Sequence, residues 1–206
     1  MKRIIFLLIM TAILMPLWAQ LETDFNSDLT DDASGIIIKG YTGQAVEVRI
    51  PATIQGIPVK IIAELAFARN QRITRVIIPE SVTEIGINAF LDCRNLIGVT
   101  LSPNLTVISN FSFANSAIES IEIPEGVTTI GTSAFANCSR LTTVTLPATI
   151  ALIETNAFNN CSSLISLTFP SSVTSIQIRN NSFSNCRSLP LGPQAALRRA
   201  GYRGRF

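Results

Sequence analysis

Apolar and polar positions repeat along this chain with a period of about 23 residues. Each unit has a short strand of alternating apolar and polar residues, a proline, a segment typified by Val-Thr-x-Ile, and a Phe that recurs in every unit. The five clear copies begin at Ile73, Leu96, Ile118, Leu141 and Leu164, so their offsets are 23, 22, 23 and 23 residues. A unit of this length cannot bury its apolar face alone, so the pattern predicts a solenoid of mutually covering coils.

Each strand of the repeat is expected to divide its side chains between the core and the solvent. In the copy LTTVTLP, Leu141, Val144 and Leu146 are predicted to point inward, and Thr143 and Thr145 outward. The proline that follows ends the strand because it cannot donate a ladder hydrogen bond. Function is therefore sought at the outward positions, which differ from coil to coil.

Two other repeat positions predict internal ladders. A phenylalanine recurs once per coil and predicts a stacked aromatic spine, which comprises Phe67, Phe90, Phe113, Phe135, Phe158 and Phe183. Two residues later comes a short amide or carboxylate, which is expected to face inward and bond backbone groups; these are Asp92, Asn115, Asn137, Asn160 and Asn185.

The four cysteines Cys93, Cys138, Cys161 and Cys186 all follow the spine phenylalanine by three residues. Stacked coils place such positions about 5 Å apart, within disulfide reach, and export to an oxidising compartment favours pairing. Parallel side chains, however, aim the two sulfurs poorly at each other. Four free buried thiols are predicted, with a disulfide between neighbouring coils as the alternative.

The ends of the chain differ from the repeat. Residues 20–45 are predicted to be an N-terminal cap, with a turn in LTDDASG and a strand in GIIIKGYTG. The solenoid is expected over residues 46–188, with an insertion around Gln55 to Pro58 in its degenerate first coil and two extra residues after Ile176 in its last. Residues 189–206 predict a C-terminal cap with a short helix, since Pro193 suits a first helical turn and Gly201 a stop.

Residues 1–19 have the character of a secretory signal peptide. Lys2 and Arg3 precede a short apolar run that contains Pro16, and Ala19 offers a small residue at the exit. The run is short for a membrane span. The protein is therefore expected to be exported to the cell surface or the extracellular space, with the periplasm as the alternative location; an uncleaved anchor is the alternative reading of the segment.

Composition excludes several kinds of chemistry. Without Lys2 and Arg3 the chain has 14 basic and 14 acidic residues, and this neutral balance gives no support for nucleic-acid binding. There is no histidine, and no coil offers a second metal ligand near its cysteine. No cofactor, metal site or catalytic residue is predicted, so the chain is expected not to be an enzyme. Two carboxylates converging from different coils, as in a hydrolase, remain the one formal alternative.

Charge is nevertheless unevenly placed along the chain. The start is acidic, with Glu22, Asp24, Asp28, Asp31 and Asp32, and the end is basic, with Arg187, Arg198, Arg199, Arg203 and Arg205. Two solvated caps account for this pattern. The alternative is that the basic end meets an anionic partner such as a polysaccharide or an acidic lipid.

The consensus L-x-x-V-x-I-P-x-x-V-T-x-I-G-x-x-A-F-x-x-C, nearly intact over 73–93 and 118–138, resembles the BspA-type leucine-rich repeat of surface proteins in host-associated bacteria. The lead-in LTDDASGIIIKGYTGQAVEVRIPATIQGIPV resembles the usual first repeat of these proteins. The ending ALRRAGYRGRF resembles a tail seen among treponemal members. The resemblance implies an α/β leucine-rich-repeat solenoid, or horseshoe, dominated by β-structure, with about six coils of 22–25 residues and a short C-terminal capping helix.

The resemblance also implies a non-enzymatic, protein-binding module that adheres to host matrix, host cells or other bacteria; the alternative is a periplasmic scaffold that binds an envelope partner. Its partner would be a protein, such as a host extracellular-matrix or cell-surface protein. The expected ligand-binding positions are outward residues of the concave strand face, namely Glu47, Arg49, Arg75, Ile77, Ser120, Glu122, Thr143 and Thr145.

Overall fold

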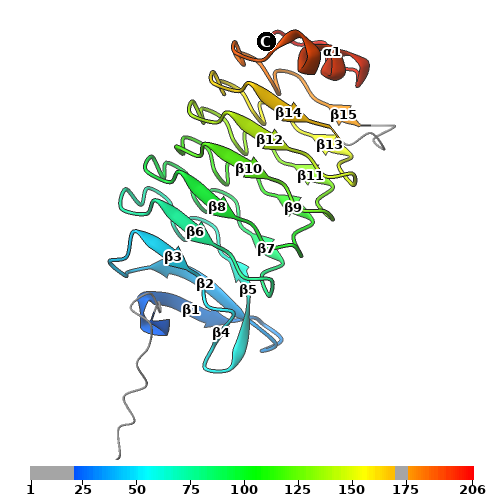
Figure 1. The fold of residues 1–206 in the computed structure, drawn as a ribbon. Helices are drawn as coiled ribbons and strands as arrows, with labels where there is room; N and C mark the ends of the chain where they lie inside the picture. The colour runs from blue at the N-terminus through cyan, green and yellow to red at the C-terminus, as the bar shows by residue number, and fades with distance from the viewer. Residues whose placement is uncertain (1–20, 170–175) are drawn as a thin grey trace, which may run out of the picture.

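A computed structural model describes residues 21–169 and 176–206. The predicted signal peptide, residues 1–19, lies outside the described residues. The described chain forms a solenoid of six coils (Figure 1). Among these residues, no helix combines the length and the apolar character that a membrane span requires.

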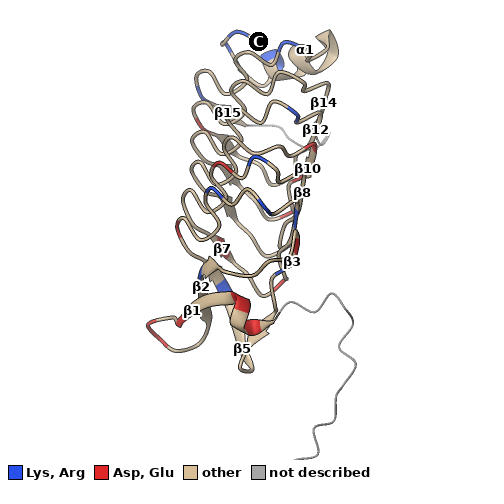
Figure 2. Cartoon of the chain, turned by 90° about the vertical axis from the view of Figure 1, so that its left-hand side faces the viewer, with Lys and Arg blue, Asp and Glu red and all other residues tan. Residues whose placement is uncertain are grey.

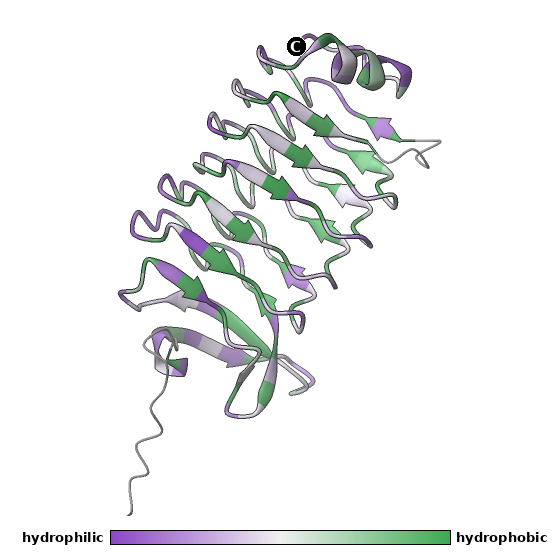
Figure 3. Cartoon of the chain, in the orientation of Figure 1, coloured by the Kyte–Doolittle hydropathy of each residue, from purple (hydrophilic) through white to green (hydrophobic). Residues whose placement is uncertain are grey.

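One face of the solenoid, here called the strand face, is built from one three-residue strand per coil. These strands are β3 (Glu47–Arg49), β6 (Arg75–Ile77), β8 (Gly98–Thr100), β10 (Ser120–Glu122), β12 (Thr143–Thr145) and β14 (Ser166–Thr168). They pair in parallel as two sheets, β3-β6-β8 and β10-β12-β14. The middle residue of each strand is buried except Val99 of β8, which is partly exposed, and Figure 3 shows the resulting apolar segments along the solenoid.

The return side of each coil is also extended. Its short parallel strands are β7 (Glu84–Ile85), β9 (Val107–Ile108), β11 (Thr129–Ile130), β13 (Leu152–Ile153) and β15 (Gln177–Ile178). Ile178 pairs with Ile153 and precedes Phe183 by five residues, just as Ile85 precedes Phe90. The two extra residues of the last coil therefore lie before β15, and their predicted place after Ile176 is wrong.

The N-terminal cap is a β-hairpin. A short 3-10 helix η1 (Glu22–Asp24) leads into β1 (Phe25–Leu29), which pairs antiparallel with β2 (Ile36–Tyr41). The insertion in the first coil is a second hairpin, β4 (Thr53–Ile54) with β5 (Ile57–Ile62). Gln55 and Gly56 at its tip both have positive φ, +52° and +79°, as a two-residue hairpin turn requires. β5 pairs in parallel with β2 and β7, so it joins the cap to the solenoid.

The phenylalanine spine forms the centre of the core. Six rings stack with centroids 4.8–5.4 Å apart, and all are buried. Tyr41 stacks on Phe67 at one end, and Tyr202 packs edge-on against Phe183 at the other. The spine is thus confirmed, and two tyrosines from the caps extend it.

The C-terminal cap contains the helix α1 (Leu191–Arg199). Pro193 lies in its first turn, and Gly201 follows its end with a φ of +97°, a conformation that glycine adopts without strain. Leu197 and Tyr202 are buried against the last coil. The short capping helix is therefore found where the sequence predicts it.

Candidate functional site

The predicted binding residues lie on the strand face as expected from their alternation. Glu47 and Arg49 flank the buried Val48 on β3, and Ser120 and Glu122 flank the buried Ile121 on β10. All four flanking residues are exposed, as is Arg75 on β6, whereas Ile77, Thr143 and Thr145 are half-buried.

The structure brings most of these residues together around two hollows. The first, of about 210 Å³, is lined by residues of β3, β6, β8 and β10, including Glu47, Arg49, Arg75, Ile77 and Ser120. Glu47 and Arg75 form an exposed ion pair across its rim, with 3.7 Å between Oε1 and Nε. The hollow therefore has charged side chains at its edge and apolar strand residues at its base.

The second hollow, of about 380 Å³, adjoins the first. It is lined by Glu122 and Glu125 and by Val99 and Thr100, and the last two residues also line the first hollow. Thr143 and Thr145 of β12 line neither hollow. The predicted site thus divides into a charged, hollowed part over β3 to β10 and a hydroxyl-bearing part over β12.

Val99 is a residue of this surface that the sequence reasoning missed. The sheets of the strand face are interrupted between β8 and β10, and Val99 is partly exposed there although its counterparts Val76 and Ile121 are buried. One sequence signal marks the interruption. In this coil the proline comes one residue late, and Ser102 takes the usual proline position and donates a hydrogen bond to the Val82 carbonyl at 2.6 Å.

The cysteines do not form a reactive site. All four are free and buried, and each of Cys93, Cys138, Cys161 and Cys186 donates its Sγ–H to a phenylalanine carbonyl of an earlier coil. Burial raises the pKa of Cys138 to about 11, because a thiolate there would lose its hydration. The described residues contain no group of three or more Cys, Asp or Glu side chains placed to hold a metal ion.

The Asn position differs from its prediction. The side chains do not turn inward to backbone groups; they lie at the surface and bond one another from coil to coil. Nδ2 of each asparagine donates to the side-chain oxygen of the preceding coil at 2.7–3.0 Å, along the series Asn185, Asn160, Asn137 and Asn115, and Asp92 accepts the last of these bonds. All five have a φ near +60°, which Asn and Asp tolerate better than other side-chain-bearing residues. The turn conformation therefore directs these side chains outward, and we call them the amide ladder.

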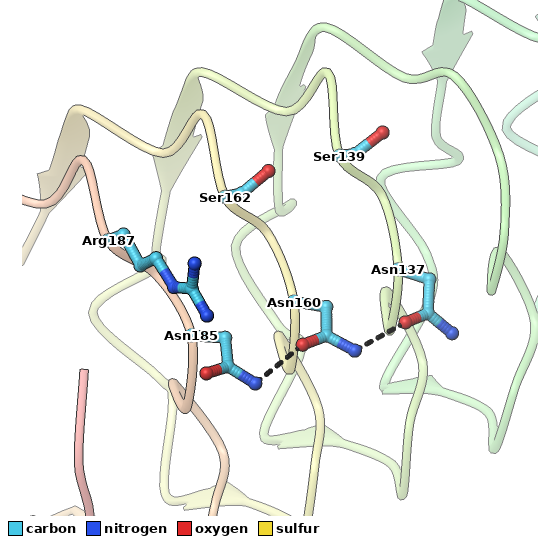
Figure 4. Close-up of a pocket in the computed structure, with 6 residues that line it drawn as sticks. All are labelled: Asn137, Ser139, Asn160, Ser162, Asn185 and Arg187. Atoms are coloured by element: carbon cyan, nitrogen blue, oxygen red, sulfur yellow. Dashed lines mark hydrogen bonds between the residues drawn. The ribbon is translucent and has the colours of Figure 1, made fainter.

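Beside the amide ladder runs a shallow trough of about 410 Å³. It is lined by Asn137, Ser139, Asn160, Ser162, Asn185 and Arg187. Figure 4 shows the amides in one row, the two serines in a second row, and Arg187 at the end nearest the C-terminal cap.

Charge divides the molecule more sharply than the sequence ends suggested. Residues 155–206 contain six arginines and no acidic residue, whereas residues 21–154 contain 8 basic and 14 acidic residues. The two parts therefore carry formal charges of +6 and −6. Figure 2 shows basic segments alone at the C-terminal end and acidic segments around the N-terminal hairpin.

Comparisons with known proteins agree with this architecture. A leucine-rich repeat protein from T. pallidum is 28% identical, has a TM-score of 0.74, and is similar over 91% of this chain and 98% of its own. A leucine rich cell surface protein from Faecalibacterium prausnitzii is 27% identical with a TM-score of 0.65, and this chain covers 40% of its length. The fold alone is shared with the pneumococcal vaccine antigen PcpA, at 21% identity and a TM-score of 0.55.

No curated protein sequence matches the chain. The family model for the BspA type leucine rich repeat region matches in six copies over residues 60–190. This match covers more than half of the chain and includes the coils from β6 to β15. The chain belongs to the BspA-type leucine-rich-repeat family.

Proposed function

We propose that this chain is a non-enzymatic protein-binding module, exported to the cell surface or secreted, that attaches to host matrix, host cells or other bacteria. The observation that carries the proposal is the double hollow over β3 to β10. There the charged side chains of Glu47, Arg75 and Glu122 surround the partly exposed Val99. Apolar area within a polar rim is the usual composition of a protein-binding patch.

The small size of the strand face determines how it would bind. Six strands spaced about 4.8 Å apart, each three residues of about 3.4 Å, give a face of roughly 300 Å². A standard interface buries about 800 Å² per partner. We therefore expect the partner to contact the flanks of the solenoid as well, or several copies of the chain to bind a repetitive partner together.

A capture assay tests the surface. Purified protein, immobilised on beads, is incubated with defined host matrix proteins, and retained protein is quantified for the wild type and for Arg49→Ala combined with Arg75→Ala. We expect the double variant to retain at least about tenfold less, because both side chains line the first hollow.

The matched control is Arg72→Ala combined with Arg94→Ala, which removes the same charge from exposed positions outside the three-residue strands. This control should bind as the wild type does. Unchanged capture by the strand-face variant, or an equal loss in the control, would show that the hollow is not the binding surface.

Location is tested separately on intact cells of the source bacterium. Protease added outside the cells should degrade the protein if it is displayed, while a periplasmic marker stays intact. Complete protection until the envelope is opened would favour the periplasmic scaffold instead.

A further inference from the structure

The trough beside the amide ladder is a second surface, distinct from the strand face. Three successive coils present equivalent triplets, Asn137-Cys138-Ser139, Asn160-Cys161-Ser162 and Asn185-Cys186-Arg187, which differ only in the last residue of the third. In each triplet the cysteine is buried and its two neighbours line the trough. The trough is therefore a repeated polar surface with one cationic side chain, Arg187, at its end.

The amides of the trough are held in place before any ligand arrives. Asn185 donates to Asn160 and Asn160 to Asn137, each at 2.7 Å (Figure 4). Asn137 in turn donates to Asn115 at 2.9 Å. An amide has two N–H groups and an oxygen with two lone pairs, so the ladder leaves donor and acceptor capacity on each. Fixed side chains lose little conformational entropy on binding, which favours recognition of a polar ligand.

The spacing of the coils selects the kind of polymer that would fit. Rings of the spine in these coils, Phe135, Phe158 and Phe183, are 5.3 and 5.2 Å apart, which gives the spacing of the coils in the core beneath the trough. An extended peptide advances about 3.4 Å per residue and falls out of register after one coil. A chain of linked sugar rings advances by close to one coil per ring, and each ring offers hydroxyl groups that both donate and accept.

Arg187 favours a ligand that carries negative charge. It takes the position that Ser139 and Ser162 hold in the preceding coils, and no carboxylate lines the trough. Residues 155–206 around it contain no acidic side chain. A guanidinium in such a setting binds a carboxylate or sulfate through two parallel hydrogen bonds.

We propose that this trough binds an acidic oligosaccharide, with successive sugar rings across the coils of Asn137, Asn160 and Asn185 and a carboxylate or sulfate at Arg187. The site is independent of the strand face, so variants of Arg49 and Arg75 should not alter it. An acidic glycan of a cell envelope or of a host matrix has the required chemistry.

Calorimetric titration with two hexasaccharides of equal length tests the ligand class. One alternates glucuronate with N-acetylglucosamine, and the other consists of N-acetylglucosamine alone. We expect the acidic hexasaccharide to bind at least about tenfold more tightly, with an affinity that falls as salt rises. No binding of the acidic hexasaccharide, or equal binding of the neutral one, would overturn the proposal.

Variants then test the position. Arg187→Ser restores the serine of the two preceding coils and should weaken binding of the acidic hexasaccharide at least about tenfold. Ser162→Asp places a carboxylate within the trough and should weaken it further by repulsion. The matched control is Arg94→Ser, which removes the same charge at the same repeat position outside the trough.

The control should bind as the wild type does. An equal loss in Arg94→Ser and Arg187→Ser would mean that diffuse charge alone attracts the glycan, and this would overturn the assignment to the trough. Tight binding to vesicles of anionic phospholipid, undiminished in Ser162→Asp and accompanied by no glycan binding, would assign the basic end to lipid instead.

Discussion

The thiol of Cys138 illustrates how position in the coil sets the chemistry of a residue. Its Sγ lies 3.3 Å from the Phe113 carbonyl and 3.3 Å from the Ser116 hydroxyl, which holds the same repeat position one coil earlier. Burial raises the pKa of Cys138 from 9.0 to about 11. The group is therefore a small, protonated core residue, and Ser116 shows that the ladder accepts a hydroxyl in its place.

We expect Cys138→Ser to reduce the loss of stability at alkaline pH. The pKa of the thiol in the folded protein exceeds its unfolded value of 9.0. The contribution of the protonated thiol to the free energy of unfolding is therefore complete below pH 9 and is lost as pH rises towards 11. Between pH 7.5 and 10.5 this amounts to about 2 kcal/mol. Urea unfolding of both proteins at the two pH values measures the difference. Equal losses in both proteins would contradict a raised pKa at Cys138.

At the scale of elements, the C-terminal cap replaces a missing next coil. The backbone N–H of Phe135 donates to the Ala157 carbonyl at 2.8 Å, and that of Phe158 donates to the Ser182 carbonyl at 2.7 Å. For Phe183 the Tyr202 hydroxyl accepts this hydrogen bond at 3.3 Å, and it donates its own proton to the Arg205 carbonyl at 2.9 Å. The cap therefore satisfies the backbone of the last coil as well as covering its ring.

Tyr202→Phe should keep the ring contact and lose this hydrogen bond. We expect the free energy of unfolding to fall by about 1–3 kcal/mol, because a buried N–H is left without a partner. Leu191→Ala in the same cap is the control, since Leu191 is 81% exposed and its loss should change stability by less than about 0.5 kcal/mol. Chemical denaturation followed by circular dichroism measures both. A Tyr202→Phe protein as stable as the wild type would show that water replaces the hydroxyl.

At the scale of the whole molecule, stability depends on contacts between successive coils. The rings of Phe113, Phe135 and Phe158 stack at 5.4 and 5.3 Å, so the central ring has an aromatic neighbour on each side. Each coil contacts mainly its neighbours, and six coils are few enough for the whole solenoid to unfold cooperatively. A defect in the middle is therefore expected to weaken the entire solenoid.

Phe135→Ala should lower the free energy of unfolding by about 3–5 kcal/mol and leave a single transition. Ile165→Ala, at a site 54% exposed, is the control and should have little effect. Denaturation followed by both circular dichroism and hydrogen exchange distinguishes the outcomes. Two separate transitions would show that the coils on either side of Phe135 unfold independently.

Much of the fold was predictable from sequence because the repeat reports the same local environment several times. The Phe, Cys and strand positions each recur at one offset, and the structure confirms the solenoid, the aromatic spine, the buried thiols and the capping helix. The placement of the extra residues before β15 was mispredicted, since an apolar pattern of Ile176 and Ile178 fits two alignments. The N-terminal hairpin was only half predicted because β1 has no strong alternation of its own.

The sequence by itself determined the period and the inward Phe and Cys positions, because these depend on residue type and spacing alone. Only the tertiary structure decided which outward residues share a surface. The interruption between β8 and β10 exposes Val99, and the positive φ of Asn137, Asn160 and Asn185 turns their amides outward beside Arg187. Both features arise from backbone conformation and from contacts between coils, which a linear pattern of apolar and polar residues does not specify.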